Sequence, residues 1–299
     1  MRTHAPRIRV LVALGLPALL TPGCFVAKPE YEHEETRDLV RLVHEAAALV
    51  ETKGEAAFAE FNQRGSKWFR GDDYVYVIDL DGVRACYPPH PEQVGRNVLD
   101  AKDVNGKPVG RWVNDEVKRP GHKGAWMHFQ WPKPDDPTPC WKSNYFLRAT
   151  APSGKSYVVL SGRYEMKIER KFITDTVEDA VALIRARGKE ALDVFRDKSS
   201  KFIFRDVCVF VTDAEGTCLV NPSSPAFEGR NVLDVRDADG RYATREILEA
   251  LKHKEAIWAK FRWPAPEEPQ PVPRLVYVGR AMLDGKTIAI GAGFNVGGE

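Results

Sequence analysis

The sequence predicts an α+β protein made of two tandem copies of one domain. The six residues GRNVLD occur at 95–100 and again at 229–234. This separation is the size of a domain and is too long for a solenoid repeat, whose period is about 20–50 residues. In both halves, a segment with apolar residues at helical spacing precedes shorter stretches of strand character. A duplicated α+β domain explains all three observations.

The register of the repeat holds along both halves, with small shifts that indicate loop changes. The offset between paired positions is constant around GRNVLD, and it decreases slightly further on and once more near the C-terminal end. Residues paired by this register share their type: Gly54 and Gly188, Phe61 and Phe195, Gly82 and Gly216, Phe129 and Phe261, Trp131 and Trp263, Tyr145 and Tyr277, Gly162 and Gly293.

Each copy is expected to begin with a long helix. Apolar residues recur at helical spacing from Leu39 to Val50, and again from Val177 to Phe195 in the second copy. Two short β runs around Asp-Gly then predict a hairpin at 74–86, matched by 207–220. A helix carrying Val109, Trp112, Val113 and Val117 follows GRNVLD, and the remaining strands are predicted at 125–131, 144–150 and 156–164.

Residues 1–23 predict a secretory signal peptide. Three arginines precede an apolar stretch of eleven residues, which is too short for a membrane-spanning helix of about 20 residues. The segment closes on TPGC, which resembles the lipobox of bacterial lipoproteins, although Thr21 stands where leucine is usual. We expect Cys24 to be lipidated and 24–35 to form a linker. An ordinary signal peptide cleaved nearby is the alternative.

A lipid at Cys24 would anchor the chain stably to a bacterial membrane, in the periplasm or at the cell surface. Phe25 in place of aspartate favours the outer membrane in a diderm cell. Without the three signal-peptide arginines, 41 basic residues (44 − 3) face 42 acidic residues, so the net charge is −1. Such a surface has no basic field for nucleic acid.

Four cysteines remain after Cys24. A disulfide between Cys86 and Cys140 is open, with buried free thiols as the alternative. If 208–218 form a hairpin with a two-residue turn, Cys218 lies opposite Val211 and Cys208 points to the other face. A bridge between those two is therefore not expected.

The motif text of each copy resembles a known family. The segments GDDYVYVIDLDG, HPEQVGRNVLDAKDVNGKPV, WMHFQWPKP and KSNYF follow one another as in the Cache domain, in its small single-unit form. The resemblance covers about 36–165 and again about 174–296. It implies two tandem PAS-like Cache domains at 36–170 and 171–299, each a long N-terminal helix plus a five-stranded antiparallel sheet that cups a small ligand.

A cation is kept at one strand position in both copies, as Lys142 and Arg274. Charge-assisted hydrogen bonds to anions are strong, so this position is a candidate for pairing with a ligand carboxylate, while a solvated cation on a strand edge is the alternative. Aromatic residues would wall such a site, although strand alternation puts Trp126 and Trp131 on opposite faces and many aromatics belong to a core. The candidate ligand-binding residues are Tyr74, Tyr76, His90, Trp126, Trp131, Lys142, Tyr145, Phe210, Trp258, Trp263, Arg274 and Tyr277. Cys208 and Ser224 replace Tyr74 and His90 in the second copy, so the two pockets should differ in ligand, or the second should be structural.

Enzyme motifs are missing from the sequence. There is no HExxH, GxSxG or CxxC, and the Asp-Gly sequences lack the spacing of a calcium loop. We therefore expect no catalysis, metal or cofactor. The sequence predicts an extracytoplasmic sensory lipoprotein that binds a small organic anion or amino acid and passes the signal to a membrane receptor or transporter. A structural or assembly module that kept the fold without a ligand is the alternative.

Overall fold

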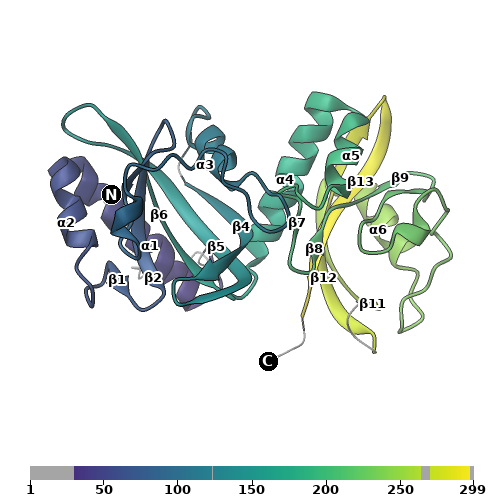
Figure 1. Ribbon diagram of the computed structural model, residues 1–299. Helices are drawn as coiled ribbons and strands as arrows, with labels where there is room; N and C mark the ends of the chain where they lie inside the picture. Colours follow the sequence, from purple (N-terminus) through teal and green to yellow (C-terminus); the bar gives the residue numbers. More distant parts are fainter. Residues whose placement is uncertain (1–29, 123, 264–269, 297–299) are drawn as a thin grey trace, which may run out of the picture. The chain divides into compact units, whose positions relative to one another are not determined.

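The computed structural model describes residues 30–122, 124–263 and 270–296. The predicted signal peptide, the predicted lipidation site Cys24 and the first half of the predicted linker, residues 24–29, lie outside these residues. Within the described part of the chain, every helix is too short or too polar to cross a bilayer. The predicted duplication is present, because helix-first α+β units follow one another along the chain (Figure 1).

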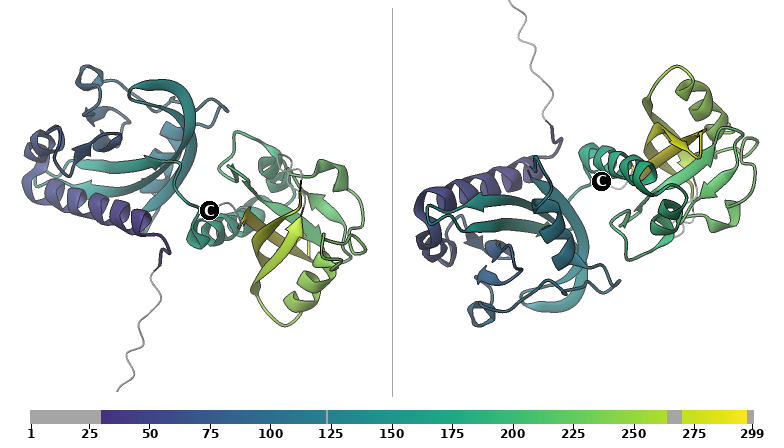
Figure 2. Two further views of the ribbon diagram at one scale, coloured as in Figure 1. Left: turned by 90° about the horizontal axis from the view of Figure 1, so that it is seen from below. Right: turned by 90° about the horizontal axis from the view of Figure 1, so that it is seen from above.

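The first unit has two helices before its sheet and one helix inserted between strands. The helices are α1 (Glu34–Lys53), α2 (Ala57–Phe61) and α3 (Val109–Val117), and the strands are β1 (Phe69–Arg70), β2 (Asp73–Asp79), β3 (Arg84–Cys86), β4 (Ala125–Lys133), β5 (Asp136–Thr150) and β6 (Ser156–Tyr164). The sheet order is β1-β2-β6-β5-β4, with β3 paired to β2, and every pairing is antiparallel. Figure 2 shows α1 running along the strands of this sheet.

The second unit repeats this order. Its helices are α4 (Arg170–Arg187), α5 (Glu190–Arg196) and α6 (Ala243–Leu251), and its strands are β7 (Ile203–Phe204), β8 (Val207–Cys208), β9 (Phe210–Asp213), β10 (Cys218–Val220), β11 (Ala256–Trp263), β12 (Val272–Leu283) and β13 (Lys286–Asn295). The sheet order is β10-β9-β13-β12-β11, and the short β7 and β8 pair separately. The fold class predicted from the sequence is therefore confirmed, with small strands added to both units.

The helix breaks that the sequence predicts fall at equivalent glycines. Gly54 follows α1 with φ +60°, and Gly188 follows α4 with φ +55°; both donate a backbone hydrogen bond to the last turn. Positive φ costs glycine little because it has no Cβ, so the chain can end one helix and begin the next in a new direction. This break lets α2 and α5 fold back onto the same core as the longer helix.

Each sheet buries both of its faces. In the first unit, Val43 and Val50 of α1 pack against Val75 and Val77, which point to one face of β2. The intervening Tyr74, Tyr76 and Ile78 point to the opposite face, where α3 packs. This division follows from the two-residue period of a strand.

The GRNVLD repeat holds the turn between β2 and β3, and in the second unit the turn between β9 and β10. The Asn97 side chain donates to the Asp81 carbonyl over 2.9 Å and accepts from the Leu99 backbone N–H over 2.9 Å. Asn231 repeats both hydrogen bonds, at 2.7 Å and 3.0 Å. A Cβ on Gly82 would meet the Leu99 side chain at 2.4 Å, so glycine is required at this turn. The repeated motif is therefore architectural.

One sequence prediction about strand length is wrong. β5 begins at Asp136, eight residues before the predicted start, and Pro132 pairs with Pro139 in the β4–β5 ladder. Proline lacks an N–H and is tolerated where a strand has a free edge. β6 pairs with β5 only from Lys142 onward, so Pro139 lies on such an edge.

Candidate functional site

A cavity of about 70 Å³ lies on the α3 side of the first sheet. Its walls come from every strand of this sheet except β1, together with the segment after β3 and the first turns of α3. The lining residues are Tyr74, Tyr76, Ile78, Arg84, Tyr87, Val98, Ala101, Val109, Gly110, Val113, Met127, Phe129, Trp131, Lys142, Asn144 and Leu160. Apolar side chains dominate the α3 end, and polar side chains gather around Lys142.

Lys142 is a buried cation in this wall. Its side chain lies on β5 opposite Tyr164 of β6, and the residue is 2% exposed. The ammonium donates to the hydroxyls of Tyr74 and Tyr164, at 3.1 Å and 3.3 Å, and lies 4.4 Å from the centroids of both rings. Among the described residues, no carboxylate lies within ion-pair distance of Lys142. Burying a charge without a counter-charge is unfavourable, so this position favours an anion from outside.

Burial sets the protonation of the whole cluster. It lowers the pKa of Lys142 to about 8, against smaller opposing effects of Tyr87, Asp73 and Asp72. Lys142 is therefore mainly an ammonium at neutral pH. Burial also raises the pKa values of Tyr74, Tyr76 and Tyr87 above their ordinary range, so these phenols keep their protons. The cavity wall is positive and rich in O–H donors.

Asn144 is a second polar group on the same face, two residues from Lys142. It is completely buried, and its Nδ2 donates to the Tyr76 hydroxyl over 2.7 Å. Its Oδ1 accepts no hydrogen bond from the described residues. A Cβ on Gly162 of β6 would lie 1.7 Å from this oxygen, so glycine makes the room that the amide occupies. Because the Tyr76 hydroxyl accepts from Asn144, its own O–H remains available to a ligand.

Arg84 brings another cation to the cavity. Its guanidinium lies 4.1 Å from the centroid of the Tyr87 ring and donates to the Gln93 side chain. The backbone of Arg84 pairs with the GRNVLD segment, because its N–H donates to Arg96 and its carbonyl accepts from Gly95. The architectural motif therefore also positions β3 at the cavity.

The second unit has a cavity of about 140 Å³ at the equivalent place. Arg274 lines it and lies opposite Asn295, as Lys142 lies opposite Tyr164. Phe210 faces Gly291 in the register that pairs Tyr76 with Leu160. The repeat register read from the sequence therefore places equivalent side chains in equivalent walls.

The candidate residues divide between the cavities and the opposite faces of the sheets. Those that line a cavity are Tyr74, Tyr76, Trp131 and Lys142 in the first unit, and Phe210, Trp263 and Arg274 in the second. Trp126 and Tyr145 lie on the α1 face of the first sheet, with ring centroids 5.1 Å apart. Trp258 and Tyr277 repeat that pair at 5.1 Å beside α4.

Strand alternation explains why these four aromatic residues lie outside the cavities. Tyr145 is three residues from Lys142, and an odd separation along a strand puts two side chains on opposite faces. The same spacing separates Tyr277 from Arg274. His90 is also outside the cavity wall: it lies beside the Tyr87 ring, at 5.9 Å between centroids, and its Nδ1 is 3.3 Å from the Glu92 carboxylate.

Sequence reasoning missed four polar residues of the first site. Asn144 could have been found, because it is two residues from Lys142 and shares its face. Arg84 could have been found in the same way, as a residue of the predicted hairpin. Tyr87 and Tyr164 depend on the path of a loop and on the β5–β6 register, which the residue pattern does not give.

The four cysteines of the described chain are free. Cys86 and Cys140 have different neighbours: the Cys86 thiol lies near Phe58, and the Cys140 thiol lies near the carbonyl of Trp131. The prediction that the side chains of Cys208 and Cys218 point to opposite faces of the hairpin is wrong, because both line the same cavity. The register shifts within the β9–β10 hairpin, so Cys218 pairs with Thr212 instead of Val211.

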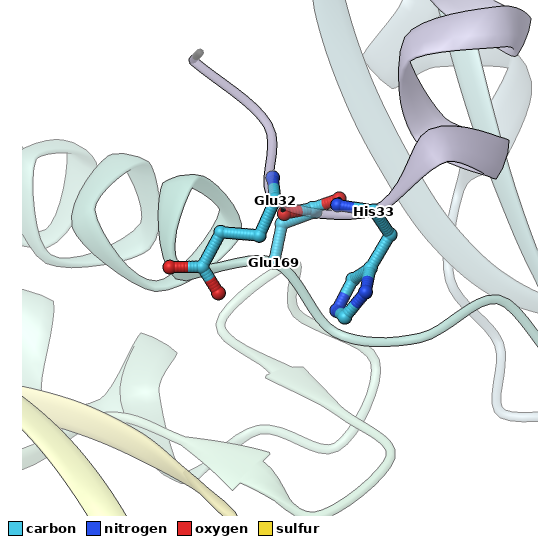
Figure 3. A group of neighbouring side chains, drawn as sticks. All are labelled: Glu32, His33 and Glu169. Carbon is cyan, nitrogen blue, oxygen red and sulfur yellow. Dashed lines mark hydrogen bonds between the residues drawn. The ribbon is translucent and has the colours of Figure 1, made fainter. Parts of the chain in front are cut away.

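One group of side chains in the described residues has the spacing of a metal site: Glu32, His33 and Glu169, with ligand atoms within 4.8 Å of one another (Figure 3). The Glu169 carboxylate already accepts the backbone N–H groups of Glu32 and His33, at 2.6 Å and 2.9 Å. Glu32 in turn forms an ion pair with Arg170 at 3.0 Å. These contacts show that Glu169 holds the backbone of the segment just before α1.

The arrangement defines each unit as a PAS-like module, with a long helix on one face of the sheet and a cavity on the other. The chain belongs to the Cache family. Residues 26–173 and 184–294 match the family described as Single Cache domain 2. Cache domains are extracytoplasmic sensory modules. The domain boundaries expected at 36–170 and 171–299 stay a prediction.

Solved structures of chemoreceptor sensor domains match parts of the chain. One was solved to explain carboxylic acid recognition by a Cache chemosensory domain; it is 24% identical, with a TM-score of 0.36, and the match covers 44% of this chain and 94% of that one. A methyl-accepting chemotaxis protein from Vibrio parahaemolyticus is 21% identical, with a TM-score of 0.35 and coverage of 44% and 88%. The ligand-binding domain of the Pseudomonas fluorescens chemoreceptor CtaA with L-serine is 12% identical, with a TM-score of 0.29 and coverage of 87% and 88%. No curated protein matches the chain.

Proposed function

We propose that the first Cache domain binds a small organic carboxylate in the cavity around Lys142. The observation that carries the proposal is the buried ammonium without a carboxylate partner among the described residues. Its present acceptors are neutral phenol oxygens. A ligand carboxylate would replace them as a charged partner, and charge-assisted hydrogen bonds are roughly twice as strong as neutral ones.

The surrounding donors suit the second carboxylate oxygen. Tyr74 and Tyr76 accept in the hydrogen bonds described above, so each hydroxyl keeps a proton to donate. The raised pKa values of both phenols keep those protons in place. A planar anion with two oxygens therefore meets an ammonium and two hydroxyl donors in one desolvated place.

Size and charge narrow the ligand class. A cavity of about 70 Å³ is roughly half the size of the apolar cavity of about 150 Å³ that accommodates benzene. Within the described lining, the charged residues are Arg84 and Lys142, and both are cations. The ammonium group of an amino acid would have no counter-charge here. These features favour a two- or three-carbon carboxylate, such as acetate, over an amino acid.

We further propose that the protein is a lipid-anchored sensor whose occupancy is read by a separate membrane receptor or transporter. A ligand that binds one conformation better shifts the population toward it, and an anchor at Cys24 would keep the domain beside its partner. Cys24→Ser should release the protein from the membrane fraction of its host. Membrane retention of that variant would contradict lipid anchoring and leave the ligand proposal intact.

The ligand proposal is tested by isothermal titration of the mature chain with acetate, propionate and alanine. Lys142→Ala should weaken acetate binding about 10–150-fold, since a hydrogen bond to a charged group contributes about 1.5–3 kcal/mol. Lys118→Ala, at an exposed lysine just beyond α3, is the control and should bind as the original chain does. Equal acetate affinity in both variants, or no binding of any small carboxylate, would overturn the proposal.

A further inference from the structure

The second Cache domain has a larger cavity than the first, with different side chains in its walls. Its volume is about 140 Å³, against about 70 Å³ for its counterpart. The main apolar contributors are Phe210, Val232, Ile247, Phe261, Trp263 and Val276. The floor of this cavity is the sheet face equivalent to the one that carries Lys142 in the first domain. The two cavities therefore have the same place in the fold and different lining side chains.

The cation of this cavity already has acceptors from its own chain. Arg274 donates through Nη2 to the carbonyls of Asp206 and Gly293, at 2.9 Å and 2.8 Å, and through Nη1 to the Asn295 side chain at 3.1 Å. The Asp206 carboxylate in turn accepts the Asn295 backbone N–H at 2.6 Å. These bonds tie the segment before β8 to the end of β13. Arg274 therefore acts as a cross-link, in contrast to Lys142, whose acceptors are phenol hydroxyls.

The donors of the first cavity are replaced one by one. Phe210 stands in place of Tyr76 and Val276 in place of Asn144, so the amide–phenol hydrogen bond has no counterpart. A Cβ on Gly293 would lie 2.5 Å from Val276 Cγ1, just as one on Gly162 would meet Asn144. The glycine that makes room for an amide in the first domain makes room for an isopropyl group in the second.

Two thiols replace two further polar groups of the first cavity. Cys208 stands in place of Tyr74, and Cys218 in place of Arg84. Thiols are weak hydrogen-bond donors and pack as small apolar groups. Burial raises the pKa of Cys218 to about 11, so this thiol is uncharged at neutral pH. The wall that holds a second cation in the first domain is therefore neutral here.

We propose that this second cavity binds a small uncharged ring compound, of the size of benzene or toluene, and does not take a carboxylate. An apolar cavity of about 150 Å³ lined by aliphatic and aromatic side chains stays dry and binds benzene. The present cavity has nearly that volume. Beside its aromatic and aliphatic side chains it carries the uncharged polar side chains of Thr212, Asn221, Ser223 and Thr244, so its lining suits a neutral molecule better than an anion. The protein would then report two unrelated chemical classes through two copies of one fold.

The test is a thermal-shift and titration series on the mature chain with toluene and benzoate, which differ by the carboxylate. Toluene should raise the unfolding temperature by about 3 °C at ten times its Kd. Ala243→Phe, on the first turn of α6, fills the second cavity and should abolish this shift. Val109→Phe, at the equivalent position of α3, fills the first cavity and should leave the toluene response unchanged.

Benzoate should give no shift. Benzoate binding that disappears in Arg274→Lys, or a toluene shift that persists in Ala243→Phe, would overturn the inference, as would no toluene shift up to saturation. Val235→Phe is a second blocking variant if Ala243→Phe does not fold. The outcome for this inference is independent of the carboxylate proposal for the first domain. Acetate binding should be blocked by Val109→Phe and Lys142→Ala, and it should be unaffected by Ala243→Phe.

Discussion

Asn144 donates a hydrogen bond to the hydroxyl of Tyr76 over 2.7 Å, across the first sheet from β5 to β2. Both members of this pair are replaced in the second domain, where Val276 and Phe210 take the same positions. Losing both together avoids the cost of leaving one buried polar group without its partner. The coupled replacement agrees with the different ligands proposed for the two cavities.

Replacing the polar pair in steps tests this coupling. Tyr76→Phe leaves the Asn144 amide buried without an acceptor, so we expect the free energy of unfolding to fall by about 1–3 kcal/mol. The double variant Tyr76→Phe with Asn144→Val copies the second domain and should recover most of that loss. Urea unfolding of the single and double variants measures the interaction energy. Additive losses would contradict the coupling.

Carboxylate binding should depend on pH through Lys142. In the free protein, burial lowers the pKa of Lys142 to about 8, and a bound carboxylate would raise it again. Below pH 8 the free lysine is already charged, so the affinity should be constant. Above pH 8 binding must take up a proton, so the affinity should fall by up to tenfold per pH unit.

Titration calorimetry of acetate at pH 7 and pH 9.5, in buffers of different ionisation enthalpy, counts the protons taken up. The phenols around Lys142 are Tyr74, Tyr87 and Tyr164, and their pKa values are all raised, so they do not titrate in this window. An affinity that is the same at both pH values would show that the ammonium is not the carboxylate partner.

Gly162 should be intolerant of any side chain. A Cβ there would lie 1.7 Å from Asn144 Oδ1, so Gly162→Ala must displace the amide from Tyr76. We expect a loss of about 1–3 kcal/mol in unfolding free energy and acetate binding weakened about tenfold. Gly279→Ala is the control in another strand, since the nearest atom to its new Cβ is 3.7 Å away. Similar results for the two variants would rule out the steric argument.

The sequence predicted the repeat register, and with it the equivalence of Lys142 in the first domain and Arg274 in the second. That prediction works because duplicated domains preserve strand spacing even where side chains change. Strand alternation also placed Trp126 and Trp131 on opposite faces of the sheet, as observed, since a strand has a fixed two-residue period. The same rule applied to Lys142 and Tyr145 would have removed Tyr145 from the cavity.

Other parts of the site depend on relationships that one strand does not contain. Tyr164 contacts Lys142 only because β5 and β6 pair in one particular register. Cys208 and Cys218 share a cavity because the β9–β10 ladder shifts its register near Cys218. The residue pattern also does not give the acceptors around each cation. Lys142 donates to phenol hydroxyls, whereas Arg274 donates to backbone carbonyls and to Asn295.

The Glu169 carboxylate should contribute to stability through the chain before α1 (Figure 3). It is completely buried and accepts the backbone N–H groups of Glu32 and His33, while the N-cap residue His33 makes no side-chain capping bond of its own to the described residues. Glu169→Leu would leave both N–H groups without an acceptor, so we expect a loss of about 1–3 kcal/mol and faster hydrogen exchange in the first turn of α1. Glu169→Gln keeps one acceptor oxygen and should lose less unfolding free energy.

Hydrogen-exchange rates by mass spectrometry measure the local effect on α1. Thermal unfolding with and without a chelator measures the effect on the stability of the whole chain. A chelator that destabilises the original chain but not Glu169→Gln would show that the carboxylate holds a cation instead of anchoring the backbone.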